Sequence, residues 1–337
     1  MEVESCLYEK LPEGKVRCRT CAWRCTIKEG KRGFCGVREN RGGRLYALNY
    51  GIVSSANVDP IEKKPLFHFY PGSYVFSLGT VGCNFRCLHC QNYQISQASL
   101  DESIRILAEY TPEQTIEMAK RYGCRGMAWT YNEPTIWFEY TYDSARLAKA
   151  EGLYTVYVTN GYMTADALER ISPYLDAMNI DVKGFTEGFY RSLCKTKLAP
   201  VLETVERAHN LGIHIELTYL IIPTYNDSIE EISRFADWVA KVDPNIPVHF
   251  SRFHPDYRLT DAPMTPTKTL EEAWKRARER LSYVYIGNVP GHEGENTTCP
   301  ECGATLIERV GYSTKVKAMK DGRCQRCGAR VPGSYAE

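Results

Sequence analysis

The middle of the chain alternates between short apolar runs and amphipathic stretches. The apolar runs are rich in β-branched and aromatic residues, which is typical of buried strands. They lie at residues 74–80, 126–131, 154–159, 177–182, 213–222 and 248–253. The intervening stretches place apolar residues at helical spacing, as Ile232, Phe235 and Val239 do. This alternation predicts an α/β fold in which about six strand–helix units form a partial, TIM-like (β/α)6 barrel.

Capping residues mark the starts of three of these helices. Residues 111–114 (Thr-Pro-Glu-Gln) supply an N-cap threonine, a proline at the first helical position and a glutamine at the third. Ser228 with Glu231 and Thr269 with Glu272 have the same capping spacing. We therefore expect a helix to begin at each of these three places.

The length and composition place this barrel between two smaller domains. With 337 residues, the chain is about twice the usual domain size. We predict an N-terminal cysteine-rich domain at residues 1–73, the barrel at 74–290 and a C-terminal metal-binding ribbon at 291–337. The hydrophobic content of 43% and the charged content of 25% are ordinary for globular proteins and argue against a disordered or fibrous chain.

Charge and hydropathy limit the partners and the compartment that the sequence predicts. The 42 Lys and Arg residues nearly balance the 41 Asp and Glu residues, so the molecule as a whole has no field that attracts a polyanion. A nucleic-acid partner is therefore disfavoured, although a local basic patch stays open. No run of 18 apolar residues occurs, and residues 1–6 lack a basic-then-apolar signal. These observations predict a cytoplasmic protein with no membrane partner.

The chain contains 14 cysteines, and their grouping indicates the chemistry. Closely spaced cysteines in a long chain without a secretory signal favour metal ligands over disulfides. Most of them form three clusters, at residues 18–35, 83–90 and 299–327, and Cys6, Cys124 and Cys194 stand apart. We expect Cys124 to be a buried packing residue, and a reactive thiol is one alternative for Cys194.

The C-terminal cluster consists of two Cys-x-x-Cys-Gly knuckles, one formed by Cys299 and Cys302 and the other by Cys324 and Cys327. Four thiolates make a closed tetrahedral site, which is structural rather than catalytic. The pattern favours zinc, with a single iron as the alternative. Because the residues between the knuckles can form short strands, we predict a zinc-ribbon or rubredoxin-like module.

The N-terminal cluster, formed by Cys18, Cys21, Cys25 and Cys35, also has four thiolates, but its spacing matches single-metal patterns less well. We expect zinc at this site, with an iron–sulfur cluster as the alternative. Arginines and lysines crowd the same stretch. They predict either a solvated face around an anionic site or a docking surface for a partner.

The middle cluster differs because Cys83, Cys87 and Cys90 have no fourth cysteine nearby. A four-iron cubane needs four outer ligands, so three cysteines leave one iron open to a substrate or cofactor. A structural metal site does not need an open coordination position. This argues against the competing hypothesis, a non-catalytic metal-binding interaction protein.

The Cys-x3-Cys-x2-Cys spacing resembles that of the radical S-adenosylmethionine (radical SAM) superfamily. The resemblance implies that Cys83, Cys87 and Cys90 hold a catalytic [4Fe–4S] cluster whose open iron chelates the amino and carboxylate groups of SAM. It also implies that the reduced cluster cleaves SAM to methionine and a 5′-deoxyadenosyl radical. His89, between the cysteines, is then expected to pack against the cluster and the cofactor rather than to bind iron.

Polar residues follow the predicted strands, and several match the superfamily's SAM-contacting segments. The residues that the resemblance assigns to SAM binding, besides His89, are Asn132, Glu133, Thr159, Asn160, Asp181, Lys183 and His254. Two departures stand out. Asn132 replaces the second glycine of a Gly-Gly-Glu-type segment, and Thr218 lies where related enzymes carry an arginine, so the SAM carboxylate must depend more on Lys183.

The pattern over residues 74–290 is similar to the glycyl-radical-enzyme activating enzymes, typified by pyruvate formate-lyase activase. With both flanking cysteine domains, it is more similar still to the AmmeMemoRadiSam-system radical SAM enzymes. The resemblance implies hydrogen abstraction from a protein substrate, with an electron donor such as ferredoxin or flavodoxin. The alternatives are an RNA or small-molecule substrate.

Overall fold

The computed structural model describes residues 1–335, and its centre is an eight-stranded sheet in the order β16-β15-β14-β13-β12-β11-β9-β8. Its parallel strands are β9 (Tyr74–Gly79), β11 (Gly126–Trp129), β12 (Tyr154–Thr159), β13 (Ala177–Asp181), β14 (His214–Ile221), β15 (Val248–Arg252) and β16 (Val284–Gly287). Among the described residues β16 pairs only with β15, so the sheet is open and the barrel is partial. The predicted fold class is confirmed, with β16 as a further strand beyond the six expected.

The other edge of the sheet comes from residues that we expected in the N-terminal domain. Strand β8 (Ser55–Pro60) runs antiparallel to β9, with Ser55 opposite Gly79 and Pro60 opposite Tyr74. The N-terminal segment therefore contributes a strand to the sheet that carries the site.

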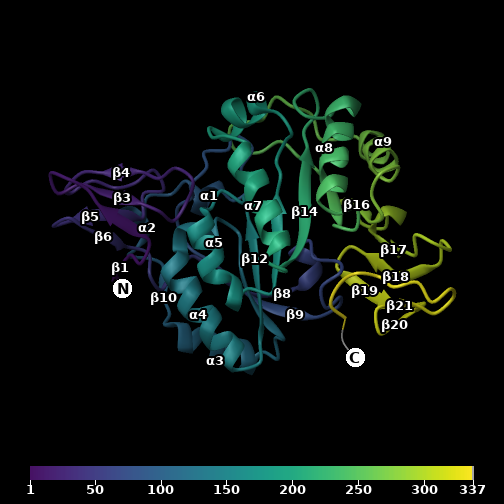
Figure 1. Ribbon diagram of the computed structural model, residues 1–337, viewed down its shortest axis with the longest axis horizontal. Coiled ribbons are helices and arrows are strands. Elements are labelled where there is room, and N and C mark those ends of the chain that lie inside the picture. Colours follow the sequence, from purple (N-terminus) through teal and green to yellow (C-terminus); the bar gives the residue numbers. More distant parts are fainter. Residues whose placement is uncertain (336–337) are drawn as a thin grey trace.

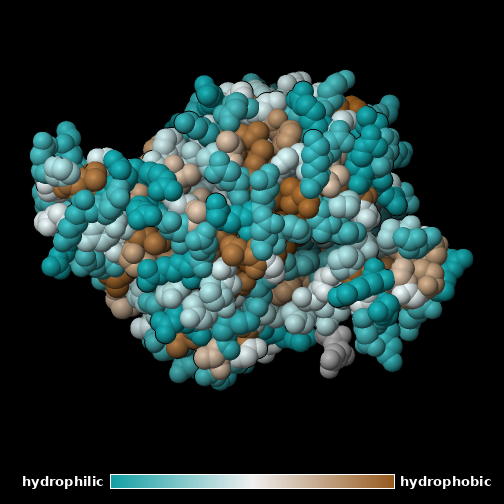
Figure 2. Space-filling view, viewed as in Figure 1, coloured by the Kyte–Doolittle hydropathy of each residue, from teal (hydrophilic) through white to brown (hydrophobic). Residues whose placement is uncertain are grey.

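Helices connect the parallel strands and cover the outside of the sheet (Figure 1). The longer ones are α3 (Pro112–Arg121), α4 (Phe138–Ala150), α5 (Ala165–Ile171), α7 (Ala199–Asn210), α8 (Ile229–Val242) and α9 (Thr267–Ala277). Figure 2 shows that the outward surface over these helices is mostly hydrophilic, with scattered apolar residues. Their buried faces carry the apolar residues that the helical spacing predicted, including Ile232, Phe235 and Val239 on α8. No helix within the described range is both long and apolar enough to cross a membrane.

The predicted helix starts are confirmed at two of three places. The Thr111 hydroxyl accepts a hydrogen bond from the Gln114 backbone N–H (3.3 Å), and the Gln114 side chain accepts one from the Thr111 N–H (2.8 Å). The Ser228 hydroxyl likewise accepts from the Glu231 N–H (3.2 Å). The third start is wrong by two residues, because α9 begins at Thr267 after Pro266, and Thr269 lies inside the first turn.

The N-terminal segment forms two small antiparallel sheets beside the barrel. One has the order β1-β6-β5 and the other β2-β3-β4. Their strands are β1 (Val3–Glu4), β2 (Tyr8–Lys10), β3 (Val16–Cys18), β4 (Thr26–Ile27), β5 (Arg38–Arg41) and β6 (Arg44–Ala47). A further pair joins β7 (Ile52–Val53) to β10 (Ala108–Glu109). In Figure 1 these sheets project from the end of the molecule opposite the C-terminal strands.

The C-terminal segment forms the predicted ribbon. Its strands are β17 (Thr297–Thr298), β18 (Thr305–Val310), β19 (Ser313–Val316), β20 (Met319–Lys320) and β21 (Arg323–Cys324). Arg309 on β18 is buried against the barrel, where its guanidinium lies 4.1 Å from the Phe67 ring centre and donates to the Phe67 carbonyl oxygen (2.8 Å). The ribbon is therefore packed onto the barrel and not merely tethered to it.

Candidate active site

A cavity opens at the carboxyl ends of the parallel strands, where barrel enzymes place their chemistry. About 850 Å³ in and around it, open solvent at the mouth included, is free of protein atoms. The loop between β9 and α1 (Tyr93–Ser96) brings Cys83, Cys87 and Cys90 to its wall. Within the described chain no other cysteine lines this cavity.

The three thiols are held where metal ligands are needed. Cys83 and Cys87 are buried, and Cys90 is half-buried. The Phe85 backbone N–H donates to Cys83 Sγ (3.3 Å), and Cys90 Sγ lies 3.0 Å from the Ser96 hydroxyl oxygen. Burial raises the pKa of the Cys83 thiol well above its ordinary value, so a bound cation is needed to stabilise the thiolate.

The spacing of these sulfurs fits a cluster better than a single ion. In the described part of the chain, only two groups of three or more potential ligand atoms lie within 4.8 Å of one another, and neither contains more than one of these three cysteines. Both ring nitrogens of His89 lack hydrogen-bond partners within residues 1–335, although the residue is 3% exposed and lines the cavity. Buried polar atoms without partners are costly, and a bound group can satisfy them. The residues present therefore fit a [4Fe–4S] cluster with a ligand beside it.

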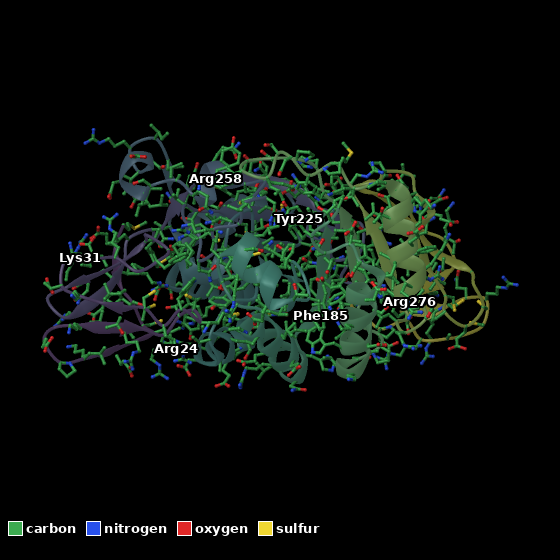
Figure 3. The ribbon with its side chains drawn as sticks, turned by 90° about the horizontal axis from the view of Figure 1, so that it is seen from above. Arg24, Lys31, Phe185, Tyr225, Arg258 and Arg276 are labelled. Atoms are coloured by element: carbon green, nitrogen blue, oxygen red, sulfur yellow. The ribbon has the colours of Figure 1, made fainter. Side chains whose placement is uncertain are left out.

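The cysteine loop is fastened from behind by the π-helix η4 (Tyr190–Cys194). The Arg86 N–H donates to the Cys194 carbonyl oxygen (3.2 Å), and the Leu88 N–H donates to that of Leu193 (2.9 Å). A second segment also holds the loop, because the Arg258 N–H donates to the Leu88 carbonyl oxygen (3.0 Å); Figure 3 labels Arg258 near the upper edge of the view. Single-turn π-helices occur frequently at functional sites.

Cys194 lies behind the loop rather than in the cavity. Its sulfur is within 4.8 Å of the ligand atoms of Cys87 and His89, yet the residue is fully buried and does not line the opening. The structure thus offers no access for a reactive thiol at this position. Cys124, the other isolated cysteine, is buried in the apolar core as expected.

Asp181 ends β13 and Lys183 follows it, and both line the cavity. The Lys183 ammonium contacts the Asp181 carboxylate at 2.9 Å. Burial lowers the pKa of Lys183, but the Asp181 carboxylate and the Cys87 thiol outweigh this effect and raise it above its ordinary value. Among the described residues that line the cavity, Lys183 is the only Lys or Arg, so it is the one permanent cation facing a ligand there.

Glu133 lies beneath the cavity rather than in its wall. Its carboxylate is fully buried and accepts hydrogen bonds from the Thr135 N–H (2.9 Å) and hydroxyl (2.6 Å), the Thr159 hydroxyl (2.6 Å) and the Asn160 N–H (2.8 Å). Thr159 is likewise behind the wall, and Asn160 lines it. Glu133 therefore positions the turn after β12 that presents Asn160 to the cavity.

Asn132 both lines the cavity and fastens the cysteine loop. Its side-chain oxygen accepts from the Thr80 N–H (3.1 Å), and its side-chain nitrogen donates to the Gly82 carbonyl oxygen (2.8 Å). His254 lies outside the wall, exposed, with Nδ1 3.3 Å from the Gln91 side-chain nitrogen. The predicted residues that the structure gathers on one wall are Cys83, Cys87, His89, Cys90, Asn132, Asn160, Asp181 and Lys183.

Several lining residues were not among the predicted site residues. Gln91, Ser251 and Asn288 also face the cavity, as does Thr218, which the sequence analysis placed where related enzymes carry an arginine. Thr218 and Ser251 lie toward the carboxyl ends of β14 and β15, and Asn288 directly follows β16 and donates to the Ser251 hydroxyl oxygen (2.9 Å). The rule that polar residues at strand ends form the site could have found Ser251 on the predicted strand, and also Asn288 had β16 been recognised.

The two flanking cysteine groups differ in geometry. In the ribbon, Cys299 and Cys327 have their sulfurs 3.5 Å apart, and Cys302 and Cys324 have theirs 3.7 Å apart, and all four lie within 4.8 Å of one another. This is a closed site for one ion. The four N-terminal cysteines instead surround an enclosed apolar cavity, and no three of their sulfurs meet the same limit.

Comparison with known proteins agrees with this architecture. The family profile of the radical SAM superfamily matches residues 77–236. An uncharacterized protein of Methanocaldococcus jannaschii is 52% identical over 97% of this chain and 98% of its own length. The pyruvate formate-lyase-activating enzyme of Clostridium pasteurianum is 22% identical over 59% of this chain and 88% of its own. The crystal structure of Streptococcus suis SuiB bound to S-adenosylmethionine has the same fold over 67% of this chain and 52% of that one, with a TM-score of 0.50 and 12% identity.

Proposed function

Because the chain belongs to the radical SAM superfamily, we propose that it uses SAM and a [4Fe–4S] cluster on Cys83, Cys87 and Cys90 to abstract hydrogen from a protein substrate. The observation that carries the proposal is one cavity wall with three widely spaced thiols, no fourth cysteine on that wall among the described residues, and a lysine–carboxylate pair beside them. Three cysteine ligands leave an iron position open to a second ligand. When bound, this cluster supplies the electron that cleaves SAM to methionine and a 5′-deoxyadenosyl radical.

The chain's own residues would hold SAM beside that opening. Lys183 provides the cation for the SAM carboxylate, a task that Thr218 cannot share because its hydroxyl carries no charge. Asp181, two residues earlier at the end of β13 and on the same cavity wall, accepts hydrogen bonds from the ribose hydroxyls. Asn132 and Asn160 offer amide groups from the next strand ends, and Glu133 acts through Asn160.

His89 has a packing role in this proposal. Burial lowers the pKa of the His89 imidazole to about 3, so the ring is neutral at physiological pH. Its nitrogens have no hydrogen-bond partner among the residues that the structure describes, and it lies on the same wall as the cysteines. A neutral ring in that place can stack on or hydrogen-bond to the adenine end of the cofactor without adding charge.

A protein substrate is supported by the relative named for activating pyruvate formate-lyase. The cavity is open to solvent, and the exposed Gln91 lines it with the exposed His254 beside Gln91. An open mouth suits a segment of another chain better than a small molecule, which enzymes usually enclose. We propose a low-potential ferredoxin or flavodoxin as the electron donor.

The substrate class can be tested with host lysate under anaerobic conditions. The reduced enzyme is incubated with SAM and with dialysed lysate that has been treated with protease, with RNase or with neither. We expect dialysed lysate to raise 5′-deoxyadenosine formation, RNase to leave this stimulation intact and protease to abolish it. Stimulation that is lost on dialysis or on RNase treatment would contradict a protein substrate. The Cys83→Ala/Cys87→Ala/Cys90→Ala variant is the negative control for 5′-deoxyadenosine formation.

A further inference from the structure

The two flanking four-cysteine groups have different sulfur spacings. A single zinc bound at 2.3 Å by four thiolates holds its sulfurs about 3.8 Å apart. The ribbon meets this requirement, with sulfur pairs at 3.5 and 3.7 Å. The N-terminal cysteines do not, because any three of them include at least one pair more than 4.8 Å apart. In this respect they match Cys83, Cys87 and Cys90 rather than the ribbon.

The four N-terminal cysteines face a common space. Cys18, Cys21, Cys25 and Cys35 all line the same cavity. Its other walls are mainly apolar, including Ile136 from the barrel. Four sulfurs around one zinc would lie in contact and leave no cavity between them. A cubane places iron at separate corners and therefore needs sulfurs that stand apart around a central space.

A buried arginine points to an anionic occupant. Arg38 is 2% exposed and lines this cavity. Its two terminal nitrogens bind the Glu139 carboxylate at 3.0 and 2.7 Å, but its Nε has no hydrogen-bond partner within the described residues. An unpaired buried N–H of a charged group is costly. A cluster with four thiolate ligands is negatively charged and offers sulfur atoms that can accept this hydrogen bond.

From the spacing, the cavity and the unpaired Arg38 Nε, we infer that Cys18, Cys21, Cys25 and Cys35 hold a second [4Fe–4S] cluster and not zinc. With a cysteine for every iron, this cluster has no open position. It can therefore neither bind SAM nor activate a substrate, and electron transfer is the chemistry left to it.

The site lies directly against the catalytic cysteine loop. A Cβ added at Gly82, which precedes Cys83, would lie 2.8 Å from the Cys35 carbonyl oxygen, so the two backbones touch there. The Arg86 side chain donates to the Phe34 carbonyl oxygen (2.6 Å), and the Trp23 indole N–H donates to the Asn84 carbonyl oxygen (2.7 Å). Residues of each loop thus bond to the other loop.

This contact suits a one-electron relay. A low-potential one-electron donor, ferredoxin or flavodoxin, would be oxidised by one electron and reduce the N-terminal cluster. That cluster would then return to its oxidised state by passing the electron to the catalytic one. The relay role rests on the proposed function, whereas the identity of the N-terminal group does not.

Metal analysis of the full chain purified anaerobically tests the inference. We expect about eight irons, matching acid-labile sulfide and about one zinc per wild-type chain. The Cys83→Ala/Cys87→Ala/Cys90→Ala variant should keep about four irons and, after reduction, show the electron paramagnetic resonance signal of a [4Fe–4S]⁺ cluster that SAM does not alter. The metal content of the wild-type chain tests the inference even if a variant fails to fold.

The reciprocal variant and a control separate the outcomes. Cys18→Ser/Cys35→Ser should keep about four irons with a SAM-sensitive signal, and Cys6→Ala, at an exposed cysteine outside the site, should match wild type. About four irons and two zincs in wild type, with an iron-free triple variant, would overturn the inference and leave the proposed function standing. Iron that never responds to SAM, in any variant, would instead count against the proposed function.

Discussion

Arg38 and Glu139 form a buried, two-pronged ion pair that joins the N-terminal β5 to helix α4 of the barrel, with Nη2 and Oε2 2.7 Å apart. The side chains of these residues are 2% and 7% exposed. Burial alone would raise the pKa of Glu139, but the Arg38 guanidinium outweighs it and lowers the pKa below its ordinary value. The N-terminal segment is therefore locked to the barrel at a point beside its own four-cysteine site.

Removing the charge of Glu139 should weaken the whole fold. Glu139→Gln leaves the Arg38 guanidinium buried without a counter-ion, so the free energy of unfolding should fall by about 3 kcal/mol. Denaturant titration measures this change. The exposed pair of Arg207 and Glu169 serves as the control, because Glu169→Gln should cost less than about 1 kcal/mol. Equal effects of the two substitutions would contradict the assigned role.

The contact at Gly82 can be tested against a matched glycine. Gly82 (φ +92°) and Gly123 (φ +66°) both have positive φ, so alanine strains the backbone at either position. Only at Gly82 would the new Cβ meet other residues, the Cys35 carbonyl oxygen at 2.8 Å and Val37 Cγ1 at 3.0 Å. Gly82→Ala should therefore destabilise the protein more than Gly123→Ala does and lower its iron content. Thermal unfolding and iron analysis measure both effects, and an equal loss in the two variants would show that the loops do not touch.

Lys183 should control SAM affinity without affecting cluster assembly. Loss of a charged hydrogen bond costs about 1.5–3 kcal/mol, so Lys183→Gln should weaken SAM binding roughly 10- to 100-fold. Its iron content should stay at the wild-type level, because Lys183 is not a ligand. Lys197→Ala, at an exposed lysine outside the cavity, is the control. Unchanged SAM affinity in Lys183→Gln would remove Lys183 from the site.

Stability should fall in mild acid because of His68. Burial lowers the pKa of His68 from 6.5 to about 4, and the nearby Glu216 carboxylate opposes this only in part. Between pH 6.5 and 4, His68 binds a proton in the unfolded chain but not in the folded chain. The titration of His68 therefore leaves the free energy of unfolding unchanged above pH 6.5 and lowers it as the pH falls from 6.5 towards 4. Wild type should lose about 3 kcal/mol over this window relative to His68→Gln. Parallel pH profiles of the two unfolding free energies would contradict the assignment.

Features set by neighbouring residues could be predicted from the sequence, and features set by distant ones could not. The capping box of Thr111 and Gln114 is formed by residues three apart, and it appears as predicted. The helix expected at Thr269 begins earlier, because Pro266 in extended conformation already ends the preceding loop. Strand β16 is only four residues long, and its assignment depends on pairing with β15.

The same limit on prediction from the sequence applies to the candidate active site. Spacing along the chain identifies Cys83, Cys87 and Cys90 as one group, because a single loop carries them. Spacing does not show that Glu133 is fully bonded beneath the wall, because its partners Thr159 and Asn160 come from another strand end. Nor does it show how far apart the N-terminal sulfurs stand.

The central claim is that the cavity at Cys83, Cys87 and Cys90 supports reductive cleavage of SAM. The enzyme, reduced anaerobically with dithionite, is incubated with SAM alone, and the products are separated by chromatography. We expect 5′-deoxyadenosine and methionine in equal amounts, formed slowly without the partner, and none from the Cys83→Ala/Cys87→Ala/Cys90→Ala variant. Wild-type protein that holds a full, reduced cluster and bound SAM yet forms no 5′-deoxyadenosine would contradict the account.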